Sequence, residues 1–168
     1  MRLLFLGDSL VEFYDWQARF PAHDAVNRGS AGETVAGLLA SLPGIMEEWT
    51  AAEGVVLMVG TNNLLAGDCF FLPDYEKILL CLRQRYPAAR ILVAGLPPLR
   101  LPWLAPPAAD RLNALLADLA QRQGARWLDL FSAFQAGPGP ASSCFSEDGV
   151  HFSDRGYQLW SALIETNL

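Results

Sequence analysis

The run GVVLMV, residues 54–59, decides how this chain folds, because every position after its first glycine is apolar. Similar runs occur at RLLFL (2–6), RILVAG (90–95) and ARWLDL (125–130), and DAVNRG (24–29) is a weaker fifth. None of them alternates polar and apolar residues. Continuous apolar runs of this length are typical of strands buried on both faces, as in a parallel sheet. We therefore predict five strands, with residues 24–29 at an edge of the sheet.

Segments with helical periodicity lie between these runs. Apolar residues recur at helical spacing in residues 73–86 and 106–124, and a last helix begins at Ser153, which suits an N-cap. Strands that alternate with helices, without a repeat or a linker, indicate one α/β domain over residues 1–168. The expected architecture is three-layered (α/β/α) and flavodoxin-like, with a parallel five-stranded sheet in the order 2-1-3-4-5.

The composition argues against several classes of function. The 168 residues carry a formal net charge of −6 without a Lys/Arg cluster, which disfavours nucleic acid and anionic membrane surfaces as partners. No apolar run approaches the roughly 20 residues of a membrane span, so we expect no stable membrane insertion. The start, MRLLFLGDSL, lacks signal-peptide features, and the three cysteines show no CxxC spacing, so we expect reduced thiols in a cytoplasmic protein. The two histidines lie far apart in sequence, and we expect no metal and no cofactor.

The first predicted strand ends in FLGDSLV (5–11), which places Ser9 at a strand-to-helix turn. Such a serine is most often an N-cap, and a nucleophile in this position would need a base nearby. His151 is the candidate base, and Asp148 is close enough to accept its other ring N–H and hold the tautomer. Gly149 permits the tight turn between them. Taken alone, this Asp-x-x-His pair would usually be a surface pair.

Two further segments could supply hydrogen-bond donors. NRGSAGET (27–34) places Gly32 just before an apolar helical stretch, where backbone N–H groups attract negative charge. It could equally be an ordinary glycine-rich turn, and it lacks the lysine and spacing of a phosphate loop. VGTNN (59–63) places Asn62 after the central strand, where its amide could point at a neighbouring site or simply stabilise a turn.

The joint placement of these residues favours a single site. Ser9, Gly32, Asn62 and His151 all follow predicted strands, and the carboxyl ends of parallel strands meet at one edge of a sheet. In the order 2-1-3-4-5, the strands before Ser9 and Asn62 are neighbours. One crevice would then hold a nucleophile, a base, an orienting acid and N–H donors, which are the groups that acyl transfer needs.

Four short blocks carry a family resemblance over nearly the whole chain. GDSL (7–10), Gly32 within its loop, GTNN (60–63) and DGVH (148–151) resemble, in order, the blocks of the SGNH (GDSL-type) hydrolase family. Within that family they are most similar to the group of platelet-activating-factor acetylhydrolase catalytic subunits and lysophospholipase-like esterases. The resemblance implies a metal-independent serine esterase that cleaves short-chain carboxylic esters, acetyl or lysophospholipid-like, through an acyl-serine intermediate.

The resemblance also implies a role for each residue. Ser9 would be the nucleophile, His151 the general base and then acid, and Asp148 its orienting partner. The oxyanion hole would consist of the backbone N–H groups of Ser9 and Gly32 with the side-chain amide of Asn62. Asp8 would brace the loop. Many members carry Asp where this chain has Asn63 and Pro where it has Phe152, which puts the substrate preference in doubt rather than the activity.

The substrate and the alternatives are less well determined. The expected pocket walls are Leu64, Leu65, Phe70 and Trp103, which could instead pack against one another or form a homodimer contact. A catalytically silent dimerisation or interaction module on the same fold is one alternative, against which the intact Ser9, Asp148 and His151 argue. A flavodoxin-like nucleotide or flavin binder is another, against which the missing phosphate loop argues.

Overall fold

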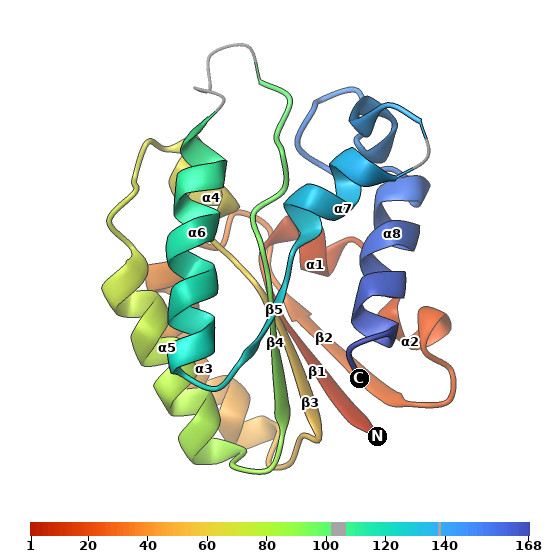
Figure 1. The fold of residues 1–168 in the computed structure, drawn as a ribbon. Helices are drawn as coiled ribbons and strands as arrows, with labels where there is room; N and C mark the ends of the chain where they lie inside the picture. Colours follow the sequence, from red (N-terminus) through yellow and green to blue (C-terminus); the bar gives the residue numbers. More distant parts are fainter. Residues whose placement is uncertain (102–106, 138) are drawn as a thin grey trace.

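The sheet of this protein, in a computed structural model that describes residues 1–101, 107–137 and 139–168, consists of five parallel strands. The strands are β1 (Arg2–Gly7), β2 (Asp24–Gly29), β3 (Gly54–Met58), β4 (Arg90–Ala94) and β5 (Arg126–Leu128). Their order across the sheet is β2-β1-β3-β4-β5, and every pair is parallel (Figure 1). The predicted fold class and strand order are therefore confirmed.

The continuous apolar pattern of the central strands follows from burial of both faces of the sheet. In β1, Leu3 and Phe5 belong to one hydrophobic cluster, while Leu4 and Leu6 belong to the other. All four side chains are 0% exposed. Because successive side chains of a strand point to opposite faces, a strand covered on both sides must be apolar at every position.

The helices cover the two faces of the sheet in separate layers (Figure 1). One layer contains α3 (Val35–Glu48), α4 (Thr61–Leu65), α5 (Leu72–Arg85) and α6 (Pro107–Arg122). The other layer contains α1 (Ser9–Glu12), α2 (Trp16–Arg19), α7 (Leu130–Ala136) and α8 (Asp154–Glu165), with a short 3-10 helix at Ala141–Cys144. This is the expected three-layer arrangement.

The fifth strand is shorter than the sequence predicted. The apolar run extends over residues 125–130, whereas β5 ends at Leu128 and α7 begins at Leu130. The change of direction is fixed by Asp129, whose side chain accepts a hydrogen bond from the Ser132 N–H and caps α7. Apolar residues that continue from a strand into the first turn of a helix give no periodicity that separates the two.

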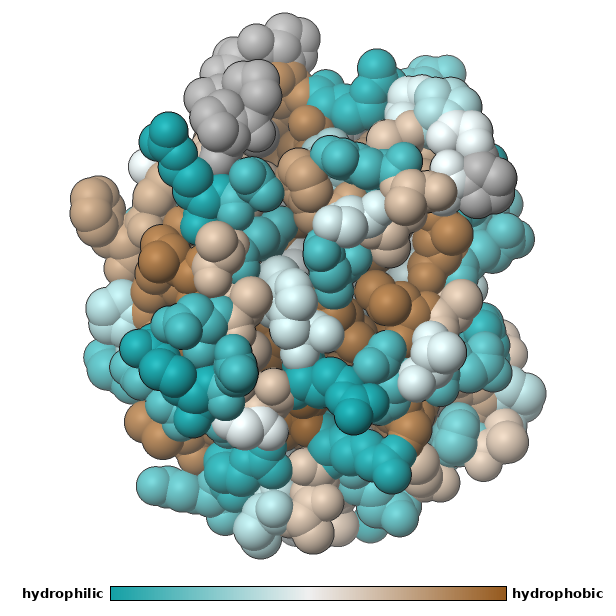
Figure 2. Space-filling model, in the orientation of Figure 1, coloured by the Kyte–Doolittle hydropathy of each residue, from teal (hydrophilic) through white to brown (hydrophobic). Residues whose placement is uncertain are grey.

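The exposed surface is chemically mixed. On the face shown in Figure 2, hydrophobic areas are separated from one another by hydrophilic side chains. Scattered apolar exposure of this kind is ordinary in folded proteins. Among the helices of the described ranges, none combines the length and the apolar character needed to cross a lipid bilayer.

Candidate active site

Three side chains from distant parts of the chain form a hydrogen-bonded row. Ser9 Oγ lies 2.9 Å from His151 Nε2, although the two residues are 142 positions apart. On the other side of the ring, His151 Nδ1 lies 2.6 Å from Asp148 Oδ2. An ionised carboxylate can only accept a hydrogen bond, so Nδ1 must carry the hydrogen in this contact. Nε2 is then without a hydrogen and can accept the bond from the Ser9 hydroxyl. The structure thus brings together the three residues that the sequence singled out for nucleophile, base and orienting acid.

Ser9 is held by α1, which is too short to be stable by itself. At its start, Asp8 is the N-cap and accepts a hydrogen bond from the Leu10 N–H at 3.0 Å. At its end, the Leu10 carbonyl accepts a bond from the Tyr157 hydroxyl, and the Val11 carbonyl accepts bonds from Trp16 and Asn27 side chains. These tertiary contacts replace the missing length and fix the backbone that carries Ser9.

The loop before α8 holds the acid and the base in a tight turn. Gly149 has φ +73°, and a Cβ there would lie 2.6 Å from the Arg100 carbonyl oxygen. Glycine is therefore required both for the backbone conformation and for the close approach of residue 100. The Arg100 N–H donates to the Gly149 carbonyl at 2.9 Å, which ties the loop to the segment after β4.

The Asp148 carboxylate is held in its charged form. Its Oδ1 accepts hydrogen bonds from the Ser146 hydroxyl and from the backbone N–H groups of Val150 and His151. Partial burial by itself raises the pKa of Asp148, but the hydrogen bonds from His151, Val150 and Ser146 outweigh it and hold that pKa well below its ordinary value. An acid that stays ionised can keep orienting the imidazole through the whole working pH range.

The loop with Gly32 offers backbone donors beside an open space. Gly32 has φ +79°, and a Cβ built on it would have no heavy atom within 4 Å. Neither the Ser9 N–H nor the Gly32 N–H donates to another group within the described part of the chain. Backbone N–H donors without an internal partner are what an incoming oxyanion requires.

Asn62 lies close to the same loop. Its Nδ2 donates to the Glu33 carbonyl at 2.8 Å, so one amide hydrogen anchors the loop. A side-chain amide carries two N–H donors, and the second remains for a substrate oxygen. The sequence predicted an N–H donor here but gave no indication that the same group also positions the Gly32 loop.

Two positioning residues were missed by the sequence analysis. Asn63 Oδ1 accepts the Val35 N–H at the start of α3, and its Nδ2 donates to Asp68 Oδ2 at 2.7 Å. Glu12 accepts the Ala31 N–H at 2.6 Å, beside Gly32. Asn63 uses both ends of its amide, which an aspartate could not do beside Asp68. Its departure from the family pattern was the only available signal, and nothing in the sequence links Glu12 to the loop.

The expected pocket walls are only partly where the sequence placed them. Leu64 is 1% exposed and packs in the core between the sheet and α3, α5 and α6, so its assignment to a pocket wall is wrong. The helical geometry of α4 turns Leu64 inward, while Leu65 stays partly exposed. Phe70 is 90% exposed, and Trp103 lies outside the described residues.

An aromatic residue that the sequence analysis overlooked lies at the site instead. Phe13 is 59% exposed, and its ring centroid is 5.4 Å from that of His151. It is the C-cap of α1, directly after the helix that carries Ser9. A large exposed apolar ring beside the imidazole provides a surface for the apolar part of a substrate.

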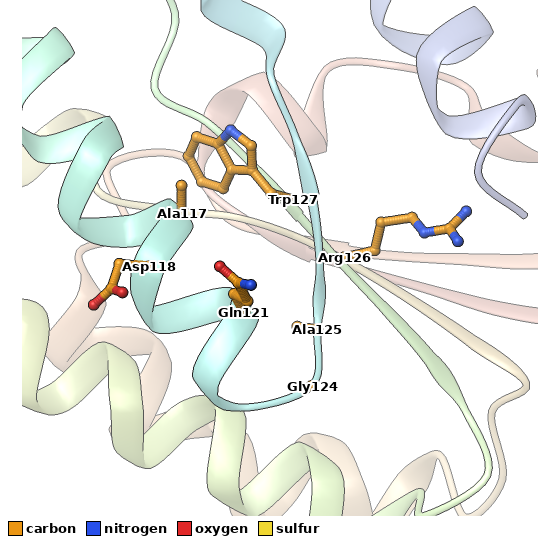
Figure 3. A pocket seen from close by; sticks show the side chains of 7 residues that line it. All are labelled: Ala117, Asp118, Gln121, Gly124, Ala125, Arg126 and Trp127. Carbon is orange, nitrogen blue, oxygen red and sulfur yellow. The ribbon is translucent and has the colours of Figure 1, made fainter.

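No cluster of three or more His, Cys, Asp or Glu side chains suited to a metal ion occurs within the described residues. An open pocket of about 670 Å³ lies elsewhere, between α6 and β5 (Figure 3). Its walls include Asp118 and Gln121 of α6 and Trp127 of β5. Because β5 is three strands away from β1, about 14 Å across the sheet, this pocket contains none of the residues around Ser9.

The residues of this site lie within a segment that known proteins share. The sequence model of the GDSL-like Lipase/Acylhydrolase family matches residues 5–159. The chain belongs to this family. The match includes Ser9, Gly32, Asn62, Asp148 and His151, so all five lie within the part of the GDSL-type acylhydrolase that its family shares.

Relatives of this GDSL-type acylhydrolase extend over most of its length. It is 30% identical to platelet-activating factor acetylhydrolase IB subunit alpha1 of Bos taurus over 161 residues. This alignment covers 92% of this chain and 69% of the bovine protein. It is 29% identical to the alpha2 subunit of Rattus norvegicus, with 92% and 70% covered. The lipase/acylhydrolase structure from Enterococcus faecalis matches with a TM-score of 0.79 at 21% identity, covering 98% of this chain and 93% of that one, which supports the fold.

Proposed function

We propose that this GDSL-type acylhydrolase is a serine esterase that cleaves short-chain carboxylic esters through an acyl-serine intermediate. The observation that carries the proposal is the row of contacts from Ser9 Oγ to His151 Nε2 at 2.9 Å and from His151 Nδ1 to Asp148 Oδ2 at 2.6 Å. A serine hydroxyl is a weak nucleophile until a neighbouring base accepts its proton, and this row supplies the base and its orienting acid.

In the first half of the reaction, Ser9 Oγ attacks the ester carbonyl carbon. His151 Nε2 takes the hydroxyl proton as the new C–O bond forms, and the imidazolium is stabilised by Asp148. When the tetrahedral intermediate collapses, His151 gives this proton to the leaving alkoxide oxygen. The alcohol departs, and the acyl group remains on Ser9.

The charge on the carbonyl oxygen is met by fixed donors. The free N–H groups of Ser9 and Gly32 and the second amide hydrogen of Asn62 would donate to it. Loss of one such donor typically lowers turnover by about 10²–10³-fold. Because Asn62 already donates to the Glu33 carbonyl, its amide is oriented before substrate arrives and needs no reorganisation during the reaction.

In the second half, a water molecule attacks the acyl-serine. His151 Nε2 accepts a proton from this water and then returns it to Ser9 Oγ as the carboxylic acid leaves. Atoms and charge balance over the cycle, with one water consumed and one acid and one alcohol released. None of these steps needs a group beyond those that the chain provides.

The substrate class is an acetyl ester or a lysophospholipid-like ester. The relatives named acetylhydrolases support a short acyl group. The exposed ring of Phe13 beside His151 supports an apolar portion in the substrate. An acyl-length series of p-nitrophenyl esters, followed by sugar acetates and lysophospholipids, tests this assignment. A preference for acyl chains of eight or more carbons would exclude the acetyl ester and leave only the lysophospholipid-like ester, whose acyl chain is long, and a lack of activity on all of these esters would contradict both.

The nucleophile is tested by comparing Ser9→Ala with the wild-type protein on p-nitrophenyl acetate. Ser41→Ala is the matched control, because Ser41 is an exposed serine on α3 whose hydroxyl donates only to the Leu38 carbonyl. We expect activity to be abolished in the first variant and retained in the second. A fluorophosphonate probe should label Ser9, as mass spectrometry of the peptide would show. Retained activity in Ser9→Ala, or a label on another residue, would rule out Ser9.

A further inference from the structure

Phe13 lies one helical turn after Ser9, on the same face of α1. Its backbone N–H donates to the Ser9 carbonyl at 3.0 Å, and side chains four positions apart on a helix are neighbours. Both residues meet the same imidazole. Ser9 Oγ lies 2.9 Å from His151 Nε2, and the ring centroids of Phe13 and His151 are 5.4 Å apart, with 36° between the ring planes. The phenyl ring therefore lies beside the serine–histidine pair.

The ring of Phe13 does not belong to the core. It is 59% exposed, and among the aromatic contacts within the described residues it has only the one with His151. The next residue, Tyr14, differs, because its ring stacks on that of Tyr157 at 4.3 Å and packs edge-on against Trp16. Apolar surface that folding leaves in water is available to an apolar ligand. Phe13 thus offers a contact surface at the site rather than a packing contact beneath it.

The proposed chemistry decides which part of the ester meets this ring. His151 Nε2 gives its proton to the leaving alkoxide, so that oxygen must come within hydrogen-bond reach of Nε2, roughly 2.6–3.2 Å. The alcohol portion extends from this oxygen and begins beside the imidazole, where Phe13 lies. The carbonyl oxygen is instead directed at the donors of Ser9, Gly32 and Asn62. The acyl chain is bonded to the carbonyl carbon and needs no contact with the imidazole.

We propose that Phe13 is a specificity-determining residue that contacts the alcohol portion of the ester, so that the site favours acetyl esters of apolar alcohols. The inference rests on the proposed function, which leaves two substrate classes open. In an acetyl ester, any large apolar portion belongs to the alcohol, because the acyl group is short. In a lysophospholipid-like ester, the long apolar chain is the acyl group and the alcohol is polar. An apolar ring on the alcohol side suits the first class.

The test compares Phe13→Ala with the wild-type protein on benzyl acetate and methyl acetate, which share the acyl group and release alcohols of similar acidity. We expect the ratio of the two kcat/KM values, benzyl over methyl, to fall about three- to tenfold in the variant, because an aromatic contact is lost. Phe13→Leu keeps an apolar side chain and should lose less. Leu115→Ala is the control: Leu115, on α6, is similarly exposed at 51%, and its replacement should leave the ratio unchanged.

Two results with the esters would overturn the proposal. An equal loss on both acetates would show that Phe13 acts only through the position of His151. A changed ratio of methyl butyrate to methyl acetate, with the benzyl-to-methyl ratio of the acetates unchanged, would place the ring on the acyl side.

A binding measurement without turnover separates this inference from the proposed function. Benzyl alcohol is titrated into the protein while NMR follows the ring C–H signals of His151, with His23, the other histidine of the chain, as the internal reference. We expect a saturable shift of the His151 signals and at least threefold weaker binding in Phe13→Ala. Equal binding by both proteins, or no shift in either, would refute the alcohol contact. A wild-type protein that binds benzyl alcohol in this way but hydrolyses none of the esters would refute the proposed function instead.

Discussion

Replacement of Asp8 by asparagine should make the folded protein more stable at neutral and alkaline pH. In an unfolded chain the carboxyl ionises around its ordinary pKa of 3.8, whereas in the fold its pKa is raised to about 7, chiefly by burial. Between these values the folded state holds a proton that the unfolded state has released. The contribution of protonated Asp8 to the stability of the fold is therefore fully present below pH 3.8 and is lost progressively as the pH rises through about 7.

The size of this effect follows from the two pKa values. They differ by about three, and each tenfold change in proton affinity is worth about 1.4 kcal/mol, so ionising Asp8 costs the fold up to about 4 kcal/mol. Asparagine is as good an N-cap as aspartate, and its Nδ2 can donate to the Thr61 hydroxyl, which otherwise has no partner in the described structure. The cost of ionisation then disappears without loss of the cap.

The measurement is urea unfolding of the wild-type protein and Asp8→Asn at pH values from 4 to 8.5. We expect nearly equal free energies of unfolding at pH 4, and a difference that grows to about 4 kcal/mol in favour of the variant by pH 8. Asp15→Asn is the matched control. Asp15 caps α2, which is as short as α1, but it is exposed, so its replacement should change stability by less than about 0.5 kcal/mol throughout.

A variant that is less stable than the wild-type protein at pH 8 would refute this reasoning. So would a difference that does not change with pH, because the effect would then not come from the ionisation of Asp8.

Three other substitutions test separate parts of the site. Asn63→Asp would place two carboxylates in contact and lower the free energy of unfolding by roughly 1–3 kcal/mol. Urea unfolding should show that the double variant with Asp68→Asn regains this stability. No recovery would contradict the role of the Asn63 amide, which links the Val35 N–H to the Asp68 carboxylate. Gly149→Ala should lower both the stability and kcat more than Gly124→Ala does. Both glycines have positive φ, but of the two only Gly149 would place a Cβ within 3 Å of a backbone atom. Equal effects of the two substitutions would exclude a steric clash at Gly149. Hydrogen bonds lower the pKa of Asp148, so its carboxylate stabilises the fold above about pH 3.8 and loses this effect on further acidification. The difference in unfolding free energy between the wild-type protein and Asp148→Asn should therefore shrink as the pH falls below about 3.8. A difference that stays constant would show that the ionised carboxylate is not the cause.

The sequence predicted the sheet well, because burial on both faces leaves a simple pattern. The runs that became β1, β3 and β4 are apolar at every position after the first, and no other element of an α/β fold shows that pattern over so few residues. The same criterion failed at β5, where apolar residues continue past Asp129 into α7. Only the capping hydrogen bond from the Ser132 N–H to Asp129 separates strand from helix, and its geometry is not visible in the sequence.

The candidate site was predictable in its reacting groups and not in its supports. Ser9 and His151 could be identified because parallel strands bring their carboxyl ends to one edge. The roles of Glu12, Asn63 and Phe13 depend on which side chain meets which backbone group across loops, and loop paths follow no periodicity. Leu64 was assigned to a pocket wall but is buried in the core. An apolar residue close to a site in the sequence is more often part of the core than of a pocket.

The long separation of Ser9 and His151 along the chain has a consequence for biosynthesis. Ser9 is synthesised first, and the imidazole that lies within hydrogen-bond distance of its hydroxyl follows 142 positions later. While those 142 residues are being added, the nascent polypeptide carries the Ser9 hydroxyl without its partner, so under the proposed function it gains hydrolytic competence only after His151 has been added and the loop before α8 has packed beside α1. A polypeptide that stops before His151 would keep Ser9 without the imidazole, so under the proposed function only chains that extend beyond His151 and fold are active.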